Sequence, residues 1–174
     1  MSIRIVLTRI SHPGNIGSAA RAMKTMGLER LCLVAPDRFP ATEATVMAAG
    51  AQDILDRAQV FPDVRSAVAD CGLVVGTTAR SRHLPWRIVE PREAAGEIAA
   101  AAATSEVAVL FGAERTGLTN DELELCQLLM TIPTGSSYGS LNVAMAVQVV
   151  AYEILLATRA AIDAGERRGR PRAS

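Results

Sequence analysis

The stretch "SHPGNIGSAARAMKTMG", residues 11–27, decides the fold class of this chain. It follows the strand-like run "IRIVLT" (3–8) and ends at Gly27, a residue type common at helix C-termini. A glycine-rich turn leading from a strand into a helix is typical of phosphate and nucleotide sites. The stretch nevertheless lacks the lysine of a phosphate loop and the spacing of a dinucleotide fingerprint. Arg21, within the expected helix, therefore needs another explanation.

The rest of the chain repeats this alternation of short apolar runs and longer helical segments. It predicts an α/β fold, with a mostly parallel sheet flanked by helices on both faces. The length of 174 residues favours one domain, residues 1–163, followed by a basic tail, 164–174, which we expect to be disordered. Strands are expected at 3–8, 31–35, 58–61, 73–78, 107–112 and 128–133, and helices at 16–27, 41–50, 63–72, 91–103, 119–126 and 141–163.

Composition excludes several classes of protein. Lys+Arg and Asp+Glu are 18 each, so no overall attraction to nucleic acid is expected and any basic surface must be local. The three cysteines are far apart and only two histidines are present, which predicts reduced thiols, a cytoplasmic protein and no metal site. The opening run "MSIRIVLTRI" predicts a strand rather than a signal peptide.

The apolar segment 141–162 raises the question of a membrane span. Asn142, Gln148, Glu153 and Arg159 interrupt it, so no uninterrupted apolar run reaches the ~20 residues that a bilayer requires. We expect a helix that is buried on most sides, with a partner surface beyond the monomer core.

Two known nucleotide-binding motifs fit poorly. "GAERTGLT" (112–119) has the glycine spacing of a phosphate loop, but Leu118 stands where the lysine would contact phosphates. "GNIG" (14–17) matches the short motif of KH modules, yet the chain is too long and too regularly alternating for that fold.

Three segments together resemble the motifs of the SPOUT RNA methyltransferases: "PGNIGSAARAMKTMGL" (13–28), "VLFGAERTGLTNDEL" (109–123) and "IPTGSSYGSLNVAMAVQVVAYE" (132–153). The similarity is closest to the TrmJ type, which 2′-O-methylates position 32 in the anticodon loop of tRNA, and "LVVGTTARSRHLPW" (73–86) also resembles that type. The resemblance implies a C-terminal deep trefoil knot and S-adenosyl-L-methionine as methyl donor. It also implies a homodimer with helix 141–162 in or near the interface.

The resemblance also assigns residues to roles. Arg21 matches an arginine proposed to activate the ribose hydroxyl. Because a guanidinium with a pKa above ~12 is a poor base, we expect it to orient the ribose and stabilise the developing alkoxide. The catalytic candidates are Arg21, Asn15, Ser140 and Asn142. The cofactor-binding candidates are Thr77, Thr78, Ala79, Gly112, Glu114, Ile132, Ser140 and Leu141.

A local basic patch supplies candidates for RNA binding. Arginines contact phosphates and an aromatic ring stacks on an unpaired base, which favours Arg80, Arg82, Arg87 and Trp86. The alternative is a solvated loop with Trp86 packed inward.

Structural roles remain open for several other candidates. Asn15 and Ser140 are each placed to cap a helix, the Thr77 hydroxyl could serve the backbone, and Glu114 could pin its loop.

Other functions also remain open. The compact TrmL type methylates position 34, other family members methylate rRNA, and a SPOUT domain can bind RNA without catalysis. "TARSRHLPW" (78–86) favours the TrmJ type over the TrmL type, although TrmJ-type enzymes usually carry a C-terminal extension.

Overall fold

Seven parallel strands form one sheet in the computed structural model of the chain, which describes residues 2–79, 86–135 and 141–171. Their order across the sheet is β3-β2-β1-β6-β4-β7-β5, and every described pair is parallel. The strands are β1 (Ile3–Thr8), β2 (Arg30–Val34), β3 (Gln59–Phe61), β4 (Cys71–Thr77), β5 (Ile88–Val89), β6 (Glu106–Phe111) and β7 (Leu128–Met130).

The central strand, β1, is buried along its whole length and pairs with β2 on one side and β6 on the other. Its side chains alternate between two cores. Ile3, Ile5 and Leu7 belong to one apolar cluster, and Val6 belongs to a second. A parallel sheet covered on both faces requires such a continuous apolar run.

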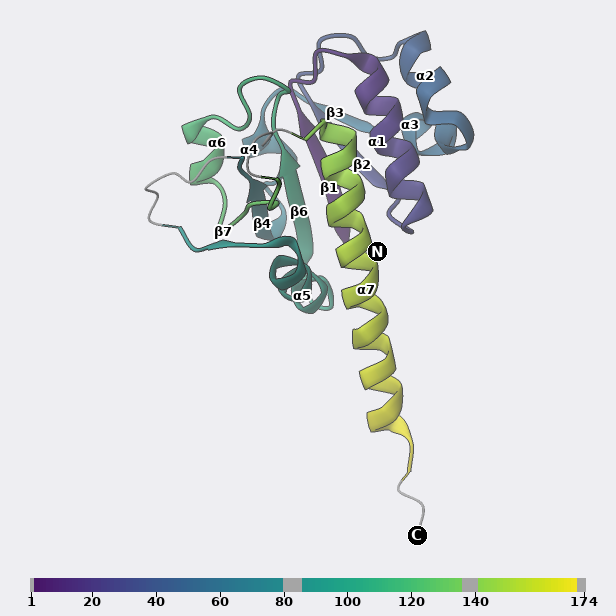
Figure 1. Cartoon of the computed structure of the whole chain (residues 1–174), viewed down its shortest axis with the longest axis vertical. Coiled ribbons are helices and arrows are strands. Elements are labelled where there is room, and N and C mark those ends of the chain that lie inside the picture. The colour runs from purple at the N-terminus through teal and green to yellow at the C-terminus, as the bar shows by residue number, and fades with distance from the viewer. Residues whose placement is uncertain (1, 80–85, 136–140, 172–174) are drawn as a thin grey trace.

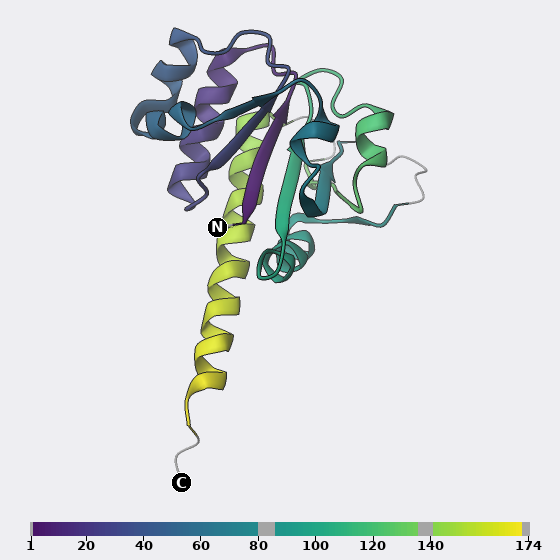
Figure 2. The same cartoon turned by 180° about the vertical axis from the view of Figure 1, so that it is seen from behind.

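Helices form the two outer layers (Figures 1 and 2). The first core is covered by α1 (Pro13–Thr25), α2 (Thr42–Ala48), α3 (Gln52–Asp56), α5 (Pro91–Ala102) and α7 (Val143–Gly169). The opposite core is covered by α4 (Val64–Ala67) and α6 (Asn120–Glu124). A short 3-10 helix, η1 (Ala49–Ala51), joins α2 to α3.

The approach of α1 to α2 depends on a glycine. A Cβ added at Gly17 would lie 2.1 Å from the carbonyl oxygen of Ala44, so any side chain there would force the helices apart. The second glycine of the opening stretch therefore serves helix packing.

The α/β architecture with a parallel sheet is confirmed, and the expected strands are found with small shifts at their ends. The expectations missed the two-residue strand β5 and the helix α3, and the expected helix 41–50 covers α2 and the start of η1. Three helix boundaries were also wrong. α1 begins at Pro13 rather than near residue 16, and the expected helix 63–72 is only α4, which ends at Ala67. α7 continues to Gly169, so residues 164–169 are helical rather than disordered. The expected C-terminal trefoil knot stays a prediction.

Among the described helices, α7 alone has the length and apolar composition needed to cross a membrane, which by itself is weak evidence. Val147, Ala151 and Ile154 on this helix are buried in the first core, and α7 packs against α1 and α5. We interpret α7 as a helix with one face in the core and one open face.

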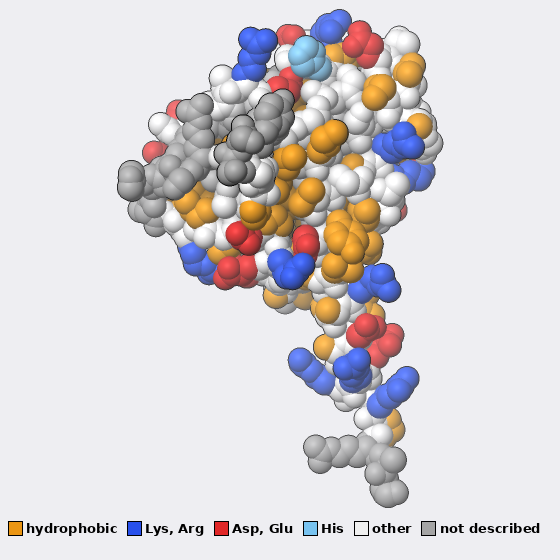
Figure 3. Space-filling view, in the orientation of Figure 1, with side chains coloured by type: hydrophobic (Ala, Val, Ile, Leu, Met, Phe, Trp, Pro, Cys, Tyr) orange, Lys and Arg blue, Asp and Glu red, His pale blue; other side chains and the backbone are white. Residues whose placement is uncertain are grey.

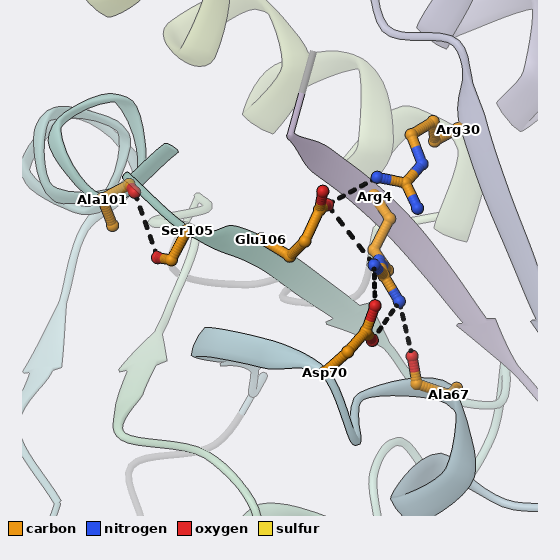
Figure 4. Close-up of polar contacts among 7 residues, drawn as sticks. All are labelled: Arg4, Arg30, Ala67, Asp70, Ala101, Ser105 and Glu106. Carbon is orange, nitrogen blue, oxygen red and sulfur yellow. Dashed lines mark hydrogen bonds and ion pairs between the residues drawn. The ribbon is translucent and has the colours of Figure 1, made fainter. Parts of the chain in front are cut away.

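A charged cluster closes the end of the sheet where β1 begins (Figure 4). Arg4 is 3% exposed and donates two hydrogen bonds to the Asp70 carboxylate, at 2.9 and 3.0 Å, and one to the Ala67 carbonyl at 3.1 Å. Its guanidinium also contacts Glu106, which pairs with Arg30. Burial lowers the pKa of Arg4, but its hydrogen bonds to carboxylates outweigh this and raise it overall. The hydrogen bond from Arg4 in turn lowers the pKa of Asp70.

We predict that Asp70→Asn lowers the free energy of unfolding at pH 7 by about 1 kcal/mol or less, because the Asp70 side chain is 66% exposed and water screens the pair. An aspartate with a lowered folded-state pKa stabilises the fold above its unfolded pKa of about 3.9 and loses that contribution as the pH falls through the folded value. The difference between wild type and variant should therefore shrink as the pH falls below about 4. Urea unfolding at pH 7 and at pH 3 measures it, with Asp37→Asn, at an exposed aspartate, as control. A difference that persists unchanged at pH 3 would contradict the assignment.

Candidate active site

The carboxyl ends of β1, β4, β6 and β7 meet at one edge of the sheet, where ligands bind in open α/β folds. A cavity of about 970 Å³ opens there, near the upper end of the ~300–1,000 Å³ range of small-molecule sites. Its wall combines apolar side chains with hydroxyls, two amides and charged groups, which suits an amphipathic ligand.

The cavity collects the expected cofactor residues from three distant parts of the sequence. It is lined by Thr77, Thr78 and Ala79 after β4, by Gly112 and Glu114 after β6, and by Ile132 and Leu141 on either side of residues 136–140. Asn15 and Asn142 line it as well. Ser140 lies outside the described residues, so its role stays a prediction.

The loop after β6, residues 112–119, is a tight turn that forms one wall of this cavity. Gly117 N donates to the Ala113 carbonyl at 2.9 Å, and Gly117 has a φ of 66°, which favours glycine. A Cβ at Gly112 would lie 2.2 Å from the Gly117 carbonyl carbon, so the turn closes directly onto Gly112. Only glycine permits that approach.

Glu114 pins this loop to the segment after β1. Its carboxylate accepts hydrogen bonds from the backbone N–H of Ser11, at 2.9 and 3.2 Å, and from the Ser11 hydroxyl. The loop-fixing role that the sequence left open for Glu114 is therefore present, and a direct contact with ligand stays a prediction. Thr77 likewise combines two roles, because it lines the cavity while its hydroxyl donates to the Leu110 carbonyl at 2.8 Å.

Asn142 links the first and third motifs. Its side-chain oxygen accepts from the N–H of Ala144 at 2.9 Å, so Asn142 caps α7, and its amide nitrogen donates to the Asn15 side-chain oxygen at 3.1 Å. The two catalytic candidates therefore orient each other. The sequence analysis left open that Asn15 and Ser140 cap helices, and neither does. His12 is the N-cap residue of α1, with Asn15 inside the helix. Asn142, rather than Ser140, is the N-cap residue of α7.

Arg21 is exposed on α1 and does not line the cavity at the sheet edge. It lies two turns or less beyond Asn15, about 9 Å along the helix axis. By helical spacing it flanks the face of α1 that carries Gly14 and Ser18, which line a neighbouring groove of about 760 Å³ between α1, α2 and α7. Asn15 and Asn142 line both hollows. The structure thus brings Arg21 near the groove rather than into the cofactor cavity.

Only part of the expected RNA-binding patch can be described. Arg80 and Arg82 lie outside the described residues. The indole N–H of Trp86 donates to the Cys126 carbonyl at 2.8 Å, and its half-buried ring packs against the second core. Arg87 pairs with Glu97 and Glu93 on α5. These contacts give Trp86 and Arg87 structural roles, and base stacking and phosphate contacts stay predictions.

The cavity is also lined by residues to which the sequence analysis assigned no role. His12 is the N-cap residue of α1, Arg115 and Thr116 belong to loop 112–119, and Thr134 lies two residues after Ile132. They fall within or beside the quoted motifs, so motif membership was the available signal. Nothing in the residue types distinguishes Arg115 from other surface arginines, because the turn that places it becomes evident only in three dimensions.

The thiols show no sign of reactivity. All three cysteines are free, and burial raises the pKa of Cys126 to about 12, which keeps it protonated. Within the described ranges, no group of three or more His, Cys, Asp or Glu side chains could hold a metal ion.

Comparison with known proteins agrees with this geometry. Residues 2–152 match the model of the SpoU rRNA Methylase family, and the chain belongs to that family. A curated relative, the tRNA (cytidine/uridine-2'-O-)-methyltransferase TrmJ of Sodalis glossinidius (strain morsitans), is 54% identical over 156 residues, which are 90% of this chain and 61% of the relative. The chain therefore spans less than two thirds of that protein.

Solved structures show the same fold. The crystal structure of TrmJ from Z. mobilis ZM4 is 42% identical, with a TM-score of 0.85 over 89% of this chain and 69% of that chain. The SpoU methyltransferase AviRb from Streptomyces viridochromogenes, in complex with the cofactor AdoMet, is 23% identical, with a TM-score of 0.69 over 92% of this chain and 60% of that chain. The second likeness concerns the fold alone.

We predict that Asn142→Ala lowers the free energy of unfolding by about 1 kcal/mol, because it removes the acceptor that caps α7. Asn142→Asp should be more stable than Asn142→Ala, since a carboxylate also accepts from the Ala144 N–H and is favourable at a helix N-terminus, and the variant loses only the exposed hydrogen bond to Asn15. Urea denaturation of the two variants measures the difference. Equal stabilities for both variants would show that the cap contributes nothing.

Proposed function

We propose that this chain is the catalytic domain of a tRNA 2′-O-ribose methyltransferase that uses S-adenosyl-L-methionine and modifies cytidine or uridine at position 32. The observation that carries the proposal is the convergence of residues 77–79, residues 112–118 and the pair Ile132 and Leu141 on one cavity, next to the paired amides of Asn15 and Asn142. Family membership and the TrmJ relatives support the reaction and the substrate.

The residues of this chain would bind and orient the reactants. When bound, S-adenosyl-L-methionine would supply an electrophilic methyl group to the ribose oxygen, its sulfur would leave as a neutral thioether, and the hydroxyl proton would be released to water. Ile132 and Leu141 offer apolar contacts and backbone groups to the adenosine portion, and Thr77 and Thr78 line the same wall. Asn15 and Asn142 are placed to hold the ribose hydroxyl, and Arg21 would stabilise the negative charge that develops on its oxygen. Ser140 would lie near the reacting groups.

We also propose a homodimer through α7. Leu141, Met145, Val149, Tyr152 and Leu156 follow one another at intervals of three or four residues, and all are exposed. Figure 3 shows hydrophobic side chains gathered over this part of the molecule. Exposed Val46 and Met47 on α2 continue the surface across the neighbouring groove. A second copy on this face would also come close to Arg21 and complete the ribose side of the site.

RNA would approach the same edge of the sheet. Arg80 and Arg82 remain candidates for phosphate contacts, whereas Arg87 would first have to leave its partners Glu93 and Glu97. We propose a cytoplasmic location, because tRNA is modified there and the cysteines are free.

One experiment separates this function from its alternatives. Isotope-labelled methyl transfer from S-adenosyl-L-methionine into bulk tRNA and into rRNA, followed by mass-spectrometric mapping, should give 2′-O-methylation at position 32 of tRNA. Methylation at position 34 would indicate the TrmL type. Labelled rRNA would favour the function in the family's description. Cofactor binding without transfer to either RNA would indicate a non-catalytic domain.

In the same assay we predict that Arg21→Ala reduces methyl transfer about 100-fold or more, the usual loss when a group that stabilises developing negative charge is removed. The affinity for S-adenosyl-L-methionine, measured by calorimetry, should not change, because Arg21 does not line the cofactor cavity. Lys24→Ala, one turn further along α1, is the matched control and should keep activity. Wild-type turnover in Arg21→Ala would discard the catalytic role.

For the dimer, we predict that Met145→Glu converts the protein to a monomer, because it places a charge in the exposed apolar stripe of α7. Ile162→Glu is the matched control, since Ile162 is on the same helix, is 56% exposed compared with 61% for Met145, and lies outside the stripe. Light scattering after size-exclusion chromatography measures the mass of each. A dimeric Met145→Glu variant would place the interface elsewhere.

A further inference from the structure

Arg9 is the first residue after β1, and it has an unusual backbone conformation. Its φ is 51°, in the left-handed region that long side chains seldom occupy. Its N–H donates to the Val34 carbonyl at 2.8 Å, which continues the pairing between β1 and β2. A non-glycine residue is held in that region only where its surroundings fix it. The contacts of the Arg9 side chain show which groups hold this residue in place.

The Arg9 guanidinium contacts two groups that flank one turn. One nitrogen, Nη2, donates to the Gly117 carbonyl at 3.1 Å, and the other, Nη1, pairs with the Glu122 carboxylate. Glu122 is 9% exposed, and its other oxygen accepts from the N–H of Thr119 at 2.8 Å, which caps α6. A single planar side chain thus connects the end of β1 to the turn at Gly117 and to the first turn of α6.

These contacts determine the position of one wall of the cofactor cavity. Residues 112–118 line the cavity, and Gly117 also closes the turn through Ala113 and Gly112. Ser11 holds Glu114 in the same loop. Segment 9–11 therefore forms hydrogen bonds with loop 112–119 at two residues, Gly117 and Glu114. The cofactor candidate Glu114 was expected from the sequence, but the contact from Arg9 was not.

We propose that Arg9 is a positioning residue for S-adenosyl-L-methionine: by joining the Gly117 carbonyl to the Glu122 carboxylate, it holds loop 112–119 in the shape that binds the cofactor. The identity of the ligand rests on the proposed function, whereas the ordering of the loop does not. Arg9 acts through the loop, because it is not among the residues that line the cavity.

The geometry distinguishes positioning from simple charge pairing. An ammonium group is a point charge on a flexible stem, whereas a guanidinium presents several donors in a fixed plane. Arg9→Lys can still neutralise the nearly buried Glu122 carboxylate, but it cannot hold that carboxylate and the Gly117 carbonyl in the same way. The lysine variant should therefore keep the fold and lose the order of the loop.

Two measurements on the full chain test the proposal. Calorimetry with S-adenosyl-L-methionine should show about tenfold weaker binding to Arg9→Lys, the size of effect expected when a hydrogen bond from a charged donor is lost. Hydrogen exchange of the ligand-free protein should show faster exchange of amides in residues 112–119, with the β1 and β6 amides unchanged. The urea midpoint should fall only slightly, by no more than the loss of one hydrogen bond produces. Arg57→Lys, at an exposed arginine after α3, is the matched control for the substitution.

Each outcome decides the matter. Weaker binding together with faster loop exchange in Arg9→Lys, but not in Arg57→Lys, supports positioning. Unchanged exchange in loop 112–119 overturns it, as does unchanged affinity. A larger fall in the urea midpoint with faster exchange throughout the protein also overturns it, because Arg9 would then be a general stabilising residue. If the wild type fails to bind S-adenosyl-L-methionine, the proposed function fails, and the exchange measurement still decides the role of Arg9 in the loop.

Discussion

Burial of the sheet on both faces is the constraint on which the rest of this structure depends. Strand side chains that face the two helical layers are mostly apolar, as Ile3, Ile5, Val6 and Leu7 of β1 are, and the buried Arg4 is paired with carboxylates. Hydroxyls, amides and charged groups are therefore restricted to the ends of the strands. Because all described strand pairs are parallel, the loops that follow β1, β4, β6 and β7 reach the same edge. The cavity between them is a consequence of this topology.

The two ends of β1 lie in different polar surroundings. At its beginning, Arg4 is buried in a cluster with Asp70 and Glu106, far along the strand from the cavity. Beyond its end, Arg9 and Ser11 contact the loop that lines the cavity. The strand between them places these two polar regions at opposite edges of the sheet.

Much of the fold could be predicted from the sequence because its signals are local. Short apolar runs predicted six of the seven strands with small errors at their ends, and Gly27 ended a helix where expected, at a φ of 77°. What was missed depends on distant contacts. Strand β5 has only Ile88 and Val89, too few for a pattern, and exists because it pairs with β7. The cap of α7 proved to be Asn142, which local spacing could not separate from Ser140.

The site was predictable to the same degree. Motif resemblance identified Gly112, Glu114 and Asn142, but it could not reveal that Glu114 accepts hydrogen bonds from Ser11 or that Asn142 donates one to Asn15, since those partners are more than 100 positions away.

The inward packing of Trp86 has a practical consequence. It is the one tryptophan in the sequence, and its indole N–H is bonded to the Cys126 carbonyl between α6 and β7. Its emission spectrum therefore belongs to a single, known environment beside residues 80–85, and the chain carries its own optical reporter of that region without any label.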